Sequence, residues 1–429
     1  MSDILDYRLQ HVLQDMIYDL PYKDRYQLRN IFSCGRRITI SNTQLGERVY
    51  LTKDIDDNVN FVGQSHCKNP FCCPVCSAKI MEEYRSKIGS ALDMLRDKFF
   101  GFMVTFTIPH LKFMSCRETT DILYDTWKYF HQKNFTKNVH YYQEFSKAVG
   151  IKHWVRVCEY TYGVNGWHPH FHCIFWCERK NKDKILEFED KLNEFWTKQA
   201  KRVTLKYWKE NKLHNEENLE DLTDRLFAFR TDKGLFISKK DGKVLESLSA
   251  DYLAGWGSDS ELTGNIRKKA SHEGHMTPYQ VLQQSEYNSE YKKIYLDFCL
   301  SVTRKPVHHR LNFSKTGILK AIQQYRQIEG YRSVIDQKKR MARVVTFFDS
   351  SEWSNLCNLN KEFPVLSNIL YLTKYDEYLL ADYLESVKIK IRRREEYEEI
   401  FEIAEAVLNG EKYKISKCCE GFQQLGHAG

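Results

Sequence analysis

Hydrophobic and polar positions alternate in a β-like pattern after Pro169, over residues 170–176 (HFHCIFW). The stretch is rich in aromatic and β-branched residues and predicts a buried β-strand. Because successive side chains of a strand point to opposite faces, His170 and His172 share one face and the apolar side chains between them share the other. Two imidazoles one pleat apart are well placed to hold a divalent ion.

A second strand is predicted upstream, over residues 151–160, and Asn165-Gly166 is a turn signal in the connection between the two strands. In an antiparallel hairpin, Glu159 comes beside the histidine pair. A set of His170, His172 and Glu159 would leave positions on a metal open for a substrate oxygen. The alternative is a pair of core histidines whose hydrogen bonds are satisfied.

Apolar residues at helical spacing predict most of the remaining elements. Helices are predicted around residues 1–30, 78–98, 122–130, 185–196, 243–256 and 377–408, and a strand over 102–108 that Pro109 ends. The polar stretch 203–222 predicts a surface insertion, and residues 226–231 and 235–239 predict a hairpin. Strands that alternate with helices indicate an α/β or α+β fold.

A group of cysteines has the spacing of a zinc site. The motif C-x5-C-P-x-C is formed by Cys67, Cys73 and Cys76. It contains the C-x2-C unit, whose thiolates occupy adjacent corners of a zinc tetrahedron. Cys34 is our choice for the fourth ligand, and His66 and Cys72 are the alternatives. The competing interpretation is a set of buried, unliganded cysteines.

Composition and charge add only broad limits. The 429 residues suffice for two or three domains, and 65 basic against 57 acidic residues give a net charge of +8. This charge is compatible with a nucleic-acid partner without identifying one. No apolar run approaches the ~18–20 residues of a membrane span, and the N-terminus lacks a signal-peptide pattern. We therefore expect a cytoplasmic protein, with no membrane partner, whose 13 cysteines are reduced or bound to metal.

In the last hundred residues the sequence shows a charged run and no motif. The predicted final helix has a charged face, which we expect to be solvated, with a DNA or partner contact as the alternative. Its members are Lys390, Arg392, Arg393, Arg394 and Glu395.

Several segments together resemble one protein family. Val155-Arg156-Val157-Cys158-Glu159-Tyr160-Thr161-Tyr162-Gly163, followed by Gly166-Trp167-His168-Pro169-His170-Phe171-His172, resembles the central motif of rolling-circle replication initiators. These are the plasmid-type Rep proteins of the HUH endonuclease superfamily. The run Cys73-Pro74-Val75-Cys76-Ser77-Ala78-Lys79-Ile80 resembles their cysteine-rich region, and the strand over 102–108 resembles their first motif. Residues 256–263, 276–278 and 310–314 extend the resemblance to roughly residues 34–320.

The resemblance implies an α+β fold whose HUH endonuclease core is an antiparallel sheet with helices on its faces. It divides the chain into an N-terminal helix and zinc-binding region (1–95), a nicking and joining domain (96–320) and a helical C-terminal region of unknown role (321–429). It assigns catalytic Mg²⁺ or Mn²⁺ to His170, His172 and Glu159. The resemblance to the family's cysteine-rich region agrees with structural Zn²⁺ at Cys67, Cys73 and Cys76, for which Cys34 is our choice of fourth ligand.

Tyr252 occupies the place of the family's nucleophilic tyrosine. A phenol with a pKa near ~10 is a poor nucleophile, so a divalent ion would help by polarising the scissile phosphate. Attack would leave the 5′ phosphate on Tyr252 and free a 3′-OH that primes DNA synthesis. The expected function is therefore site-specific nicking and joining of single-stranded or hairpin origin DNA. No G-x4-G-K-[ST] phosphate loop occurs, so a separate host helicase and polymerase are expected as partners.

The chain departs from the family pattern around this tyrosine. Gly255 stands where related proteins often carry Lys, and Lys268 and Lys269 follow only later. Asp251 and Glu246 are the nearest acids that could assist a terminating cleavage, and neither is in an equivalent place. These departures bear on termination more than on the first nick.

Other interpretations remain open. Tyr291 and Tyr295 are four residues apart, on one helix face, and form an alternative nucleophile site. A relaxase or a single-strand transposase would share the chemistry and differ in the DNA substrate. From other classes come a catalytically inactive, zinc-containing DNA-binding regulator and a purely structural zinc protein.

Overall fold

The computed structural model describes residues 4–38, 46–55, 57–131, 141–213, 218–228, 234–246, 274–303, 311–314, 318–328, 342–360 and 363–408. The chain forms two compact units, one of residues 1–11, 33–67 and 332–429 and one of residues 12–32 and 68–331. Both contain an antiparallel sheet and helices, so the expected α+β class is confirmed at this level. None of the described helices is both long and apolar enough to cross a membrane.

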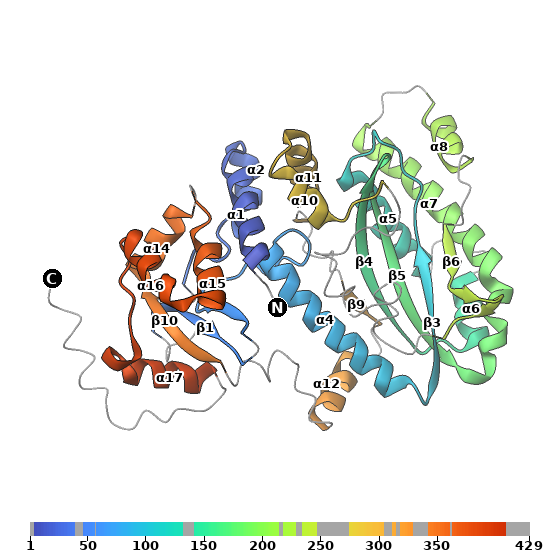
Figure 1. Cartoon of the computed structure of the whole chain (residues 1–429). Coiled ribbons are helices and arrows are strands. Elements are labelled where there is room, and N and C mark those ends of the chain that lie inside the picture. Colours follow the sequence, from blue (N-terminus) through green and yellow to red (C-terminus); the bar gives the residue numbers. More distant parts are fainter. Residues whose placement is uncertain are drawn as a thin grey trace. The chain divides into compact units, whose positions relative to one another are not determined.

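A five-stranded sheet lies at the centre of the second unit (Figure 1). Its strands, in spatial order, are β6 (Leu235–Ile237), β3 (Phe99–Phe106), β5 (Gly166–Glu178), β4 (His153–Gly163) and β9 (Leu311–Phe313). Each neighbouring pair is antiparallel. Gly166 opens β5 with φ +86°, a backbone conformation that glycine adopts without steric cost. The strand with the histidine pair is therefore the middle strand of the sheet.

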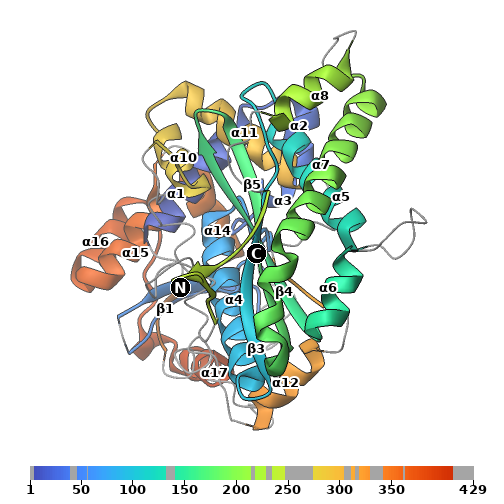
Figure 2. The ribbon, with the colours of Figure 1, turned by 90° about the vertical axis from the view of Figure 1, so that its right-hand side faces the viewer.

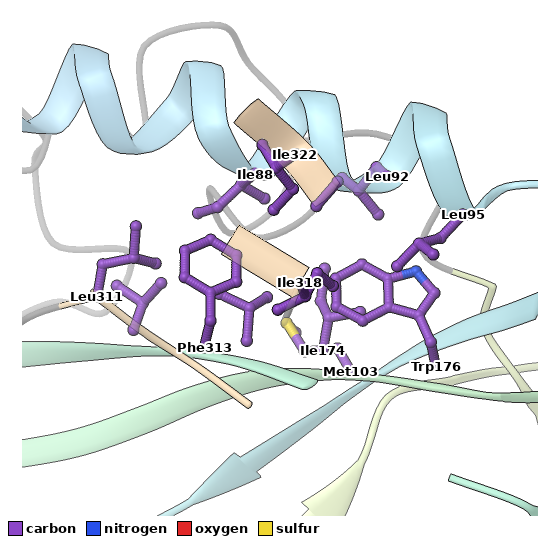
Figure 3. Close-up of a cluster of buried hydrophobic side chains, with 13 residues drawn as sticks. Ile88, Leu92, Leu95, Met103, Ile174, Trp176, Leu311, Phe313, Ile318 and Ile322 are labelled. Atoms are coloured by element: carbon purple, nitrogen blue, oxygen red, sulfur yellow. The ribbon is translucent and has the colours of Figure 1, made fainter. Parts of the chain in front are cut away.

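One face of this sheet is covered by two helices, α4 (Pro74–Leu95) and α12 (Ile318–Ile328). Figure 3 shows their apolar side chains against side chains of β3, β5 and β9. The buried cluster consists of Ile88, Ala91, Leu92, Leu95, Met103, Val155, Val157, Ile174, Trp176, Leu311, Phe313, Ile318 and Ile322. On β5, Ile174 and Trp176 share the parity of His170 and His172, so the metal-ligand candidates and this core lie on the same face.

The opposite face is covered by α5 (Cys116–His131), α6 (Tyr141–Val149) and α7 (Glu189–Asn211) (Figures 1 and 2). Aromatic rings dominate here: Phe106 of β3 lies edge-on to Trp127 at 5.2 Å and to Trp196 at 4.9 Å between ring centroids. Phe171 and Phe175 of β5 point to this face too. The alternation along β5 thus separates an aromatic core from the candidate site.

Helix α7 corrects one prediction. The polar stretch 203–222 was expected to be a surface insertion, but α7 continues through it to Asn211, and α8 (Leu219–Ala228) follows. The reason is a buried stripe at helical spacing within the polar sequence, formed by Leu192, Trp196, Ala200, Val203, Thr204 and Trp208. The helix begins at Glu189, after 3-10 turns over residues 179–188 that include part of the predicted helix start.

Two predictions between residues 226 and 256 are also wrong in the described part. The first arm of the expected hairpin is helical to Ala228, and β6 pairs with β3 instead. Asp241-Gly242 forms the turn between β7 (Lys239–Lys240) and β8 (Lys243–Val244), with φ of +51° and +73°, instead of starting a helix. This conformation suits a two-residue hairpin turn.

The N-terminal helical prediction resolves into α1 (Ile4–Tyr18), α2 (Tyr22–Gln27) and α3 (Arg29–Phe32). Pro21 immediately precedes α2 and cannot continue α1 as a regular helix.

The first unit is organised around a three-stranded antiparallel sheet of β10 (Arg343–Asp349), β1 (Arg48–Lys53) and β2 (Val59–Val62). The region predicted to be helical therefore also contributes a strand. After β10 the chain forms the helices α14 (Ser350–Leu359), α15 (Val365–Tyr375), α16 (Glu377–Ser386) and α17 (Glu398–Leu408). Phe401 and Ala404 of α17 pack on Tyr50, Val344 and Phe347.

The charged run near residue 392 lies outside the α-helices, and four of its five members, Lys390, Arg393, Arg394 and Glu395, are exposed as expected. Arg392 lies outside the helices, its side chain is 13% exposed, and it pairs with Asp349 at 3.0 Å and with Glu352. Its guanidinium lies 4.9 Å from the ring centroid of Phe347. Arg394 pairs with Glu405. Arg392 thus links the segment after α16 to β10 and α14, and Arg394 links it to α17.

Trp208→Phe should destabilise the second unit. Trp208 is fully buried, and its indole nitrogen donates to the carboxylate of Glu118, which is 3% exposed. Removing the donor weakens the satisfaction of a buried carboxylate and should cost about 1–3 kcal/mol in the free energy of unfolding. Urea unfolding followed by circular dichroism measures this, with Lys198→Ala on the exposed side of α7 as the control. If Trp208→Phe lowers the free energy of unfolding by the same amount in a Glu118→Gln background, the charge of Glu118 is not the origin of the loss.

The stability of the first unit should depend on pH through Asp349. Burial raises the pKa of this carboxyl, but hydrogen bonds from Glu352 and Ser351 and the charge of Arg392 outweigh burial and hold the pKa below its ordinary value. The stabilisation is therefore present above the unfolded pKa of about 3.9 and is lost as pH falls through the lower folded pKa. Asp349→Asn, which keeps a capping side chain, should flatten the acid limb of urea-unfolding midpoints, whereas Asp382→Asn should not. Equal acid limbs in Asp349→Asn and the wild type would contradict this.

Candidate metal centre on the central strands

The candidate ligands meet because of the register between β4 and β5. Glu159 lies directly opposite His170, and Val157 lies opposite His172. Directly opposed residues of an antiparallel pair point to the same face, so the Glu159 carboxylate lies beside both imidazoles. The hairpin prediction for these three residues is thus matched by the structure.

The atoms face one another at distances that fit one ion. Glu159 Oε2 lies 3.5 Å from His170 Nε2 and 3.4 Å from His172 Nε2. Ligands about 2.1 Å from a metal in tetrahedral or octahedral geometry are separated by about 3.0 to 3.5 Å. One potential ligand atom from each of the three residues lies within 4.8 Å of the others. This His₂Glu group can therefore hold a metal ion, whose identity the donor set does not fix.

Hydrogen bonds orient both imidazoles. His170 Nδ1 lies 3.3 Å from the carbonyl oxygen of His168, which only accepts, so Nδ1 carries a proton and Nε2 is the nitrogen turned toward Glu159. His172 Nδ1 lies 3.0 Å from the hydroxyl of Thr105, on the neighbouring strand β3. Partners of this kind fix ring orientation in metal sites. The Nε2 atoms face Glu159 as a result.

The carboxylate is held in its charged form. Burial raises the pKa of Glu159, but the neighbouring His172 and hydrogen bonds from His170 and His172 outweigh burial, so the pKa lies well below its ordinary value. A carboxylate that stays ionised is available as a ligand over the physiological pH range.

A second histidine pair lies beside this group. His168 is on the same face of β5, with its ring 5.2 Å from that of His170. His110, in the loop after β3, stacks on His168 with 4.7 Å between ring centroids and 9° between ring planes. His110 is not among the residues predicted for the site, because nothing local to Pro109-His110 indicates that this loop returns to β5.

The cysteines expected to bind zinc also come together. The Sγ atoms of four cysteines lie within 4.8 Å of one another: Cys34, Cys67, Cys73 and Cys76. Four thiolates at about 2.3 Å from zinc are about 3.8 Å apart, so the group fits a tetrahedral ion. Neither His66 nor Cys72 belongs to this group among the described residues. The backbone after Cys67 is shaped by Asn69, whose side-chain oxygen accepts hydrogen bonds from the backbone of Phe71 and Cys72.

The tyrosine candidates have different outcomes. Tyr252 lies outside the described residues, as do Asp251, Gly255, Lys268 and Lys269. Tyr295 is on α11 (Ser289–Thr303), is 2% exposed, and donates its hydroxyl to the carbonyl oxygen of Cys72 at 2.7 Å. Burial raises its pKa well above the ordinary value, which makes Tyr295 a poor nucleophile. The structure therefore argues against the alternative in which Tyr291 and Tyr295 act together as nucleophiles.

Glu246, one acid considered for termination, is described. It pairs with Arg179 at 2.8 Å and lies opposite Phe102 at the edge of the sheet. Its carboxylate has a structural partner there.

Comparisons of the chain with protein-family models, curated proteins and solved structures find no match.

Thr105→Val should weaken metal binding at the His₂Glu group. The substitution keeps the side-chain shape but removes the hydroxyl that contacts His172 Nδ1, and losses of such partners typically lower metal affinity 10- to 100-fold. Titration with Mn²⁺, with free ion measured by electron paramagnetic resonance, gives the affinity. Thr105→Ser retains the hydroxyl and should bind within about threefold of the wild type. Unchanged affinity in Thr105→Val would show that the hydroxyl does not position this ligand.

Proposed function

We propose that the protein is a metal-dependent endonuclease that nicks and rejoins single-stranded DNA and initiates rolling-circle replication of a plasmid or similar element. The observation that carries the proposal is the His₂Glu group, in which Glu159, His170 and His172 converge from two paired strands with oriented imidazoles. It supports the HUH-type core that the sequence resemblance predicts.

A divalent ion at this group would polarise the scissile phosphate and stabilise charge on its non-bridging oxygens. Mn²⁺ suits the imidazole ligands better than Mg²⁺, although both are candidates. Glu159, His170 and His172 would supply three ligands to such an ion, and further coordination positions would be available to phosphate oxygens. The cysteine group would bind Zn²⁺ in a structural role.

In the proposed reaction, the hydroxyl oxygen of Tyr252 attacks the scissile phosphorus. The bond between phosphorus and the 3′ oxygen breaks, the phenol gives up its proton to solvent, and the 3′ oxygen takes up one. The 5′ phosphate remains on the tyrosine, and the 3′-OH serves as primer. The phosphotyrosyl ester conserves the energy of the broken bond, so a 3′-OH can reverse the step without ATP.

The chain between Glu246 and Tyr252 is long enough for Tyr252 to act as the nucleophile at the metal group. Glu246 lies opposite Phe102, and Thr105, three residues further along β3, lies opposite His172. Strand geometry places Glu246 about 14 Å from His172, from about 10 Å along the strands and about 10 Å across them. Tyr252 is six residues after Glu246, and six residue steps span at most about 20 Å, so the chain length allows Tyr252 to meet the metal group.

Two alternatives are retained. A relaxase or single-strand transposase would use the same groups on a different DNA. A zinc-containing DNA-binding regulator without catalysis is favoured by one observation, Gly255 in the place where related proteins often carry Lys. The absence of nicking on single-stranded DNA from the protein's own replicon with Mn²⁺ present, despite tight binding, would favour the regulator.

Tyr252→Phe should abolish covalent attachment to DNA and leave DNA binding intact. Full-length protein is incubated with Mn²⁺ and labelled single strands tiled across its own replicon, denatured, and examined for a protein–DNA adduct that mass spectrometry maps to a residue. His170→Ala with His172→Ala should lower cleavage by at least about 100-fold, because the ion would lose two of three ligands. Tyr291→Phe is the matched control and should retain the adduct. An adduct that persists in Tyr252→Phe would move the nucleophile elsewhere.

A further inference from the structure

Three tyrosines at four-residue intervals are exposed at the junction of α1 and α2. Tyr18, Tyr22 and Tyr26 are 57%, 73% and 54% exposed. The rings of Tyr22 and Tyr26 lie 6.2 Å apart and are tilted by 31°. Single exposed aromatic residues are common on protein surfaces, but a cluster of three is a candidate binding surface.

The tyrosines alternate with positive charges. The Arg29 guanidinium lies 4.0 Å from the ring centroid of Tyr26, and that of Arg25 lies 5.7 Å from the ring of Tyr18. Arg25 also donates to the Tyr18 carbonyl oxygen at 3.2 Å. We call these five residues, Tyr18, Tyr22, Arg25, Tyr26 and Arg29, the tyrosine–arginine surface.

The backbone beneath this surface is anchored within the second unit. Leu28 and Ile31 are 1% and 2% exposed, and the Gln27 side chain donates to the Leu300 carbonyl oxygen at 2.7 Å. Helix α2 consequently lies beside α11 (Figures 1 and 2). The exposed rings are thus held on a fixed base, which lowers the entropic cost of ordering them on a ligand.

Helix α11 in turn contacts the strands that carry the metal group. Phe298 of α11 stacks on Trp167 of β5 with 4.6 Å between ring centroids and contacts Tyr160 of β4 at 5.1 Å. These two residues are immediate sequence neighbours of His168 and Glu159. The tyrosine–arginine surface therefore belongs to the same packed unit as the candidate metal centre.

A second exposed tyrosine cluster in the first unit has the opposite electrostatic character. Tyr371, Tyr375 and Tyr378 are 53%, 62% and 92% exposed. Acidic residues follow or surround them along the chain: Asp376, Glu377, Asp382 and Glu385. Lys374 Nζ lies 5.4 Å from the ring centroid of Tyr375, but the four carboxylates outnumber this single cation, and the surface therefore provides an internal control.

We propose that the tyrosine–arginine surface binds a single strand of nucleic acid, with bases stacked on the tyrosine rings and phosphates near the arginines. The proposal rests on the proposed function, which requires such a strand to be held while its phosphate is cleaved. Rings interleaved with cations are the combination used for sequence-tolerant single-strand binding, since every base has an aromatic face. The acidic cluster on α15 and α16 would repel the phosphates.

The test measures binding without catalysis. Full-length Tyr252→Phe protein is titrated into fluorescein-labelled oligo(dT) of 20 nucleotides, without added divalent ions, and fluorescence anisotropy gives Kd at several salt concentrations. A stacked base contributes a factor of about 5 to 150, so adding Tyr22→Ala and Tyr26→Ala should raise Kd at least about tenfold. Tyr22→Trp with Tyr26→Trp should restore binding. Arg29→Gln should reduce the slope of log Kd against log salt by about 0.7.

Tyr375→Ala with Tyr378→Ala is the matched control and should leave Kd unchanged. An unchanged Kd in the Tyr22/Tyr26 variant would overturn the proposal. An equal loss of affinity in the control variant would overturn it too, because it indicates a general effect on the protein. Failure of the tryptophan variant to restore binding would do so as well, because it indicates a structural role for the tyrosines. If the surface binds a protein partner instead, Kd for DNA is unchanged in the Tyr22/Tyr26 variant.

Failure of this proposal is distinguishable from failure of the proposed function. With Tyr252 intact, the Tyr22/Tyr26 variant should nick with a raised KM and an unchanged kcat. If the wild type never nicks DNA but the anisotropy results hold, the surface stands and the nickase does not. If nicking occurs with unaltered KM in the variant, the nickase stands and the surface does not.

Discussion

The pairing register of β4 against β5 is the constraint on which the candidate site depends. It places Glu159 opposite His170 and Val157 opposite His172, so that one carboxylate oxygen lies between two imidazole nitrogens. A shift by one residue would turn the Glu159 side chain to the aromatic face of the sheet and separate the three ligands. The hairpin that joins β4 to β5 fixes this register, with Gly166 supplying the left-handed conformation at its end.

The rest of the second unit stabilises that arrangement. Helices α4 and α12 bury the far part of the face that carries the histidines (Figure 3), and aromatic rings from α5, α6 and α7 bury the other. Strand β3 adds the Thr105 hydroxyl beside His172. Packing on both faces leaves the imidazoles few alternative positions. Because the ligand side chains are already ordered, the free-energy cost of ordering them when a metal binds is small.

The parts of the site that the sequence predicted are those set by local geometry. A period of two places His170 and His172 on one face, a turn signal brings Glu159 back to them, and the C-x2-C spacing groups Cys73 with Cys76. What could not be predicted depends on distant contacts. The length of α7 follows from Trp208 reaching Glu118, β6 pairs with β3 more than 100 residues earlier, and β10 pairs with β1 from the other end of the chain. The role of Tyr252 stays a prediction, because it depends on family resemblance and not on contacts.

Strands β4 and β5 bring two imidazoles and one carboxylate together as a candidate metal site. Electron spin echo envelope modulation of one equivalent of Mn²⁺, added to full-length protein whose cysteine group is filled with Zn²⁺, tests it most directly. If both imidazoles bind the ion, modulation comes from two histidine nitrogens in the wild type, from one in His170→Gln, and from none when His172→Gln is added. Bound Mn²⁺ without nitrogen modulation, or modulation unaffected by both substitutions, would contradict it.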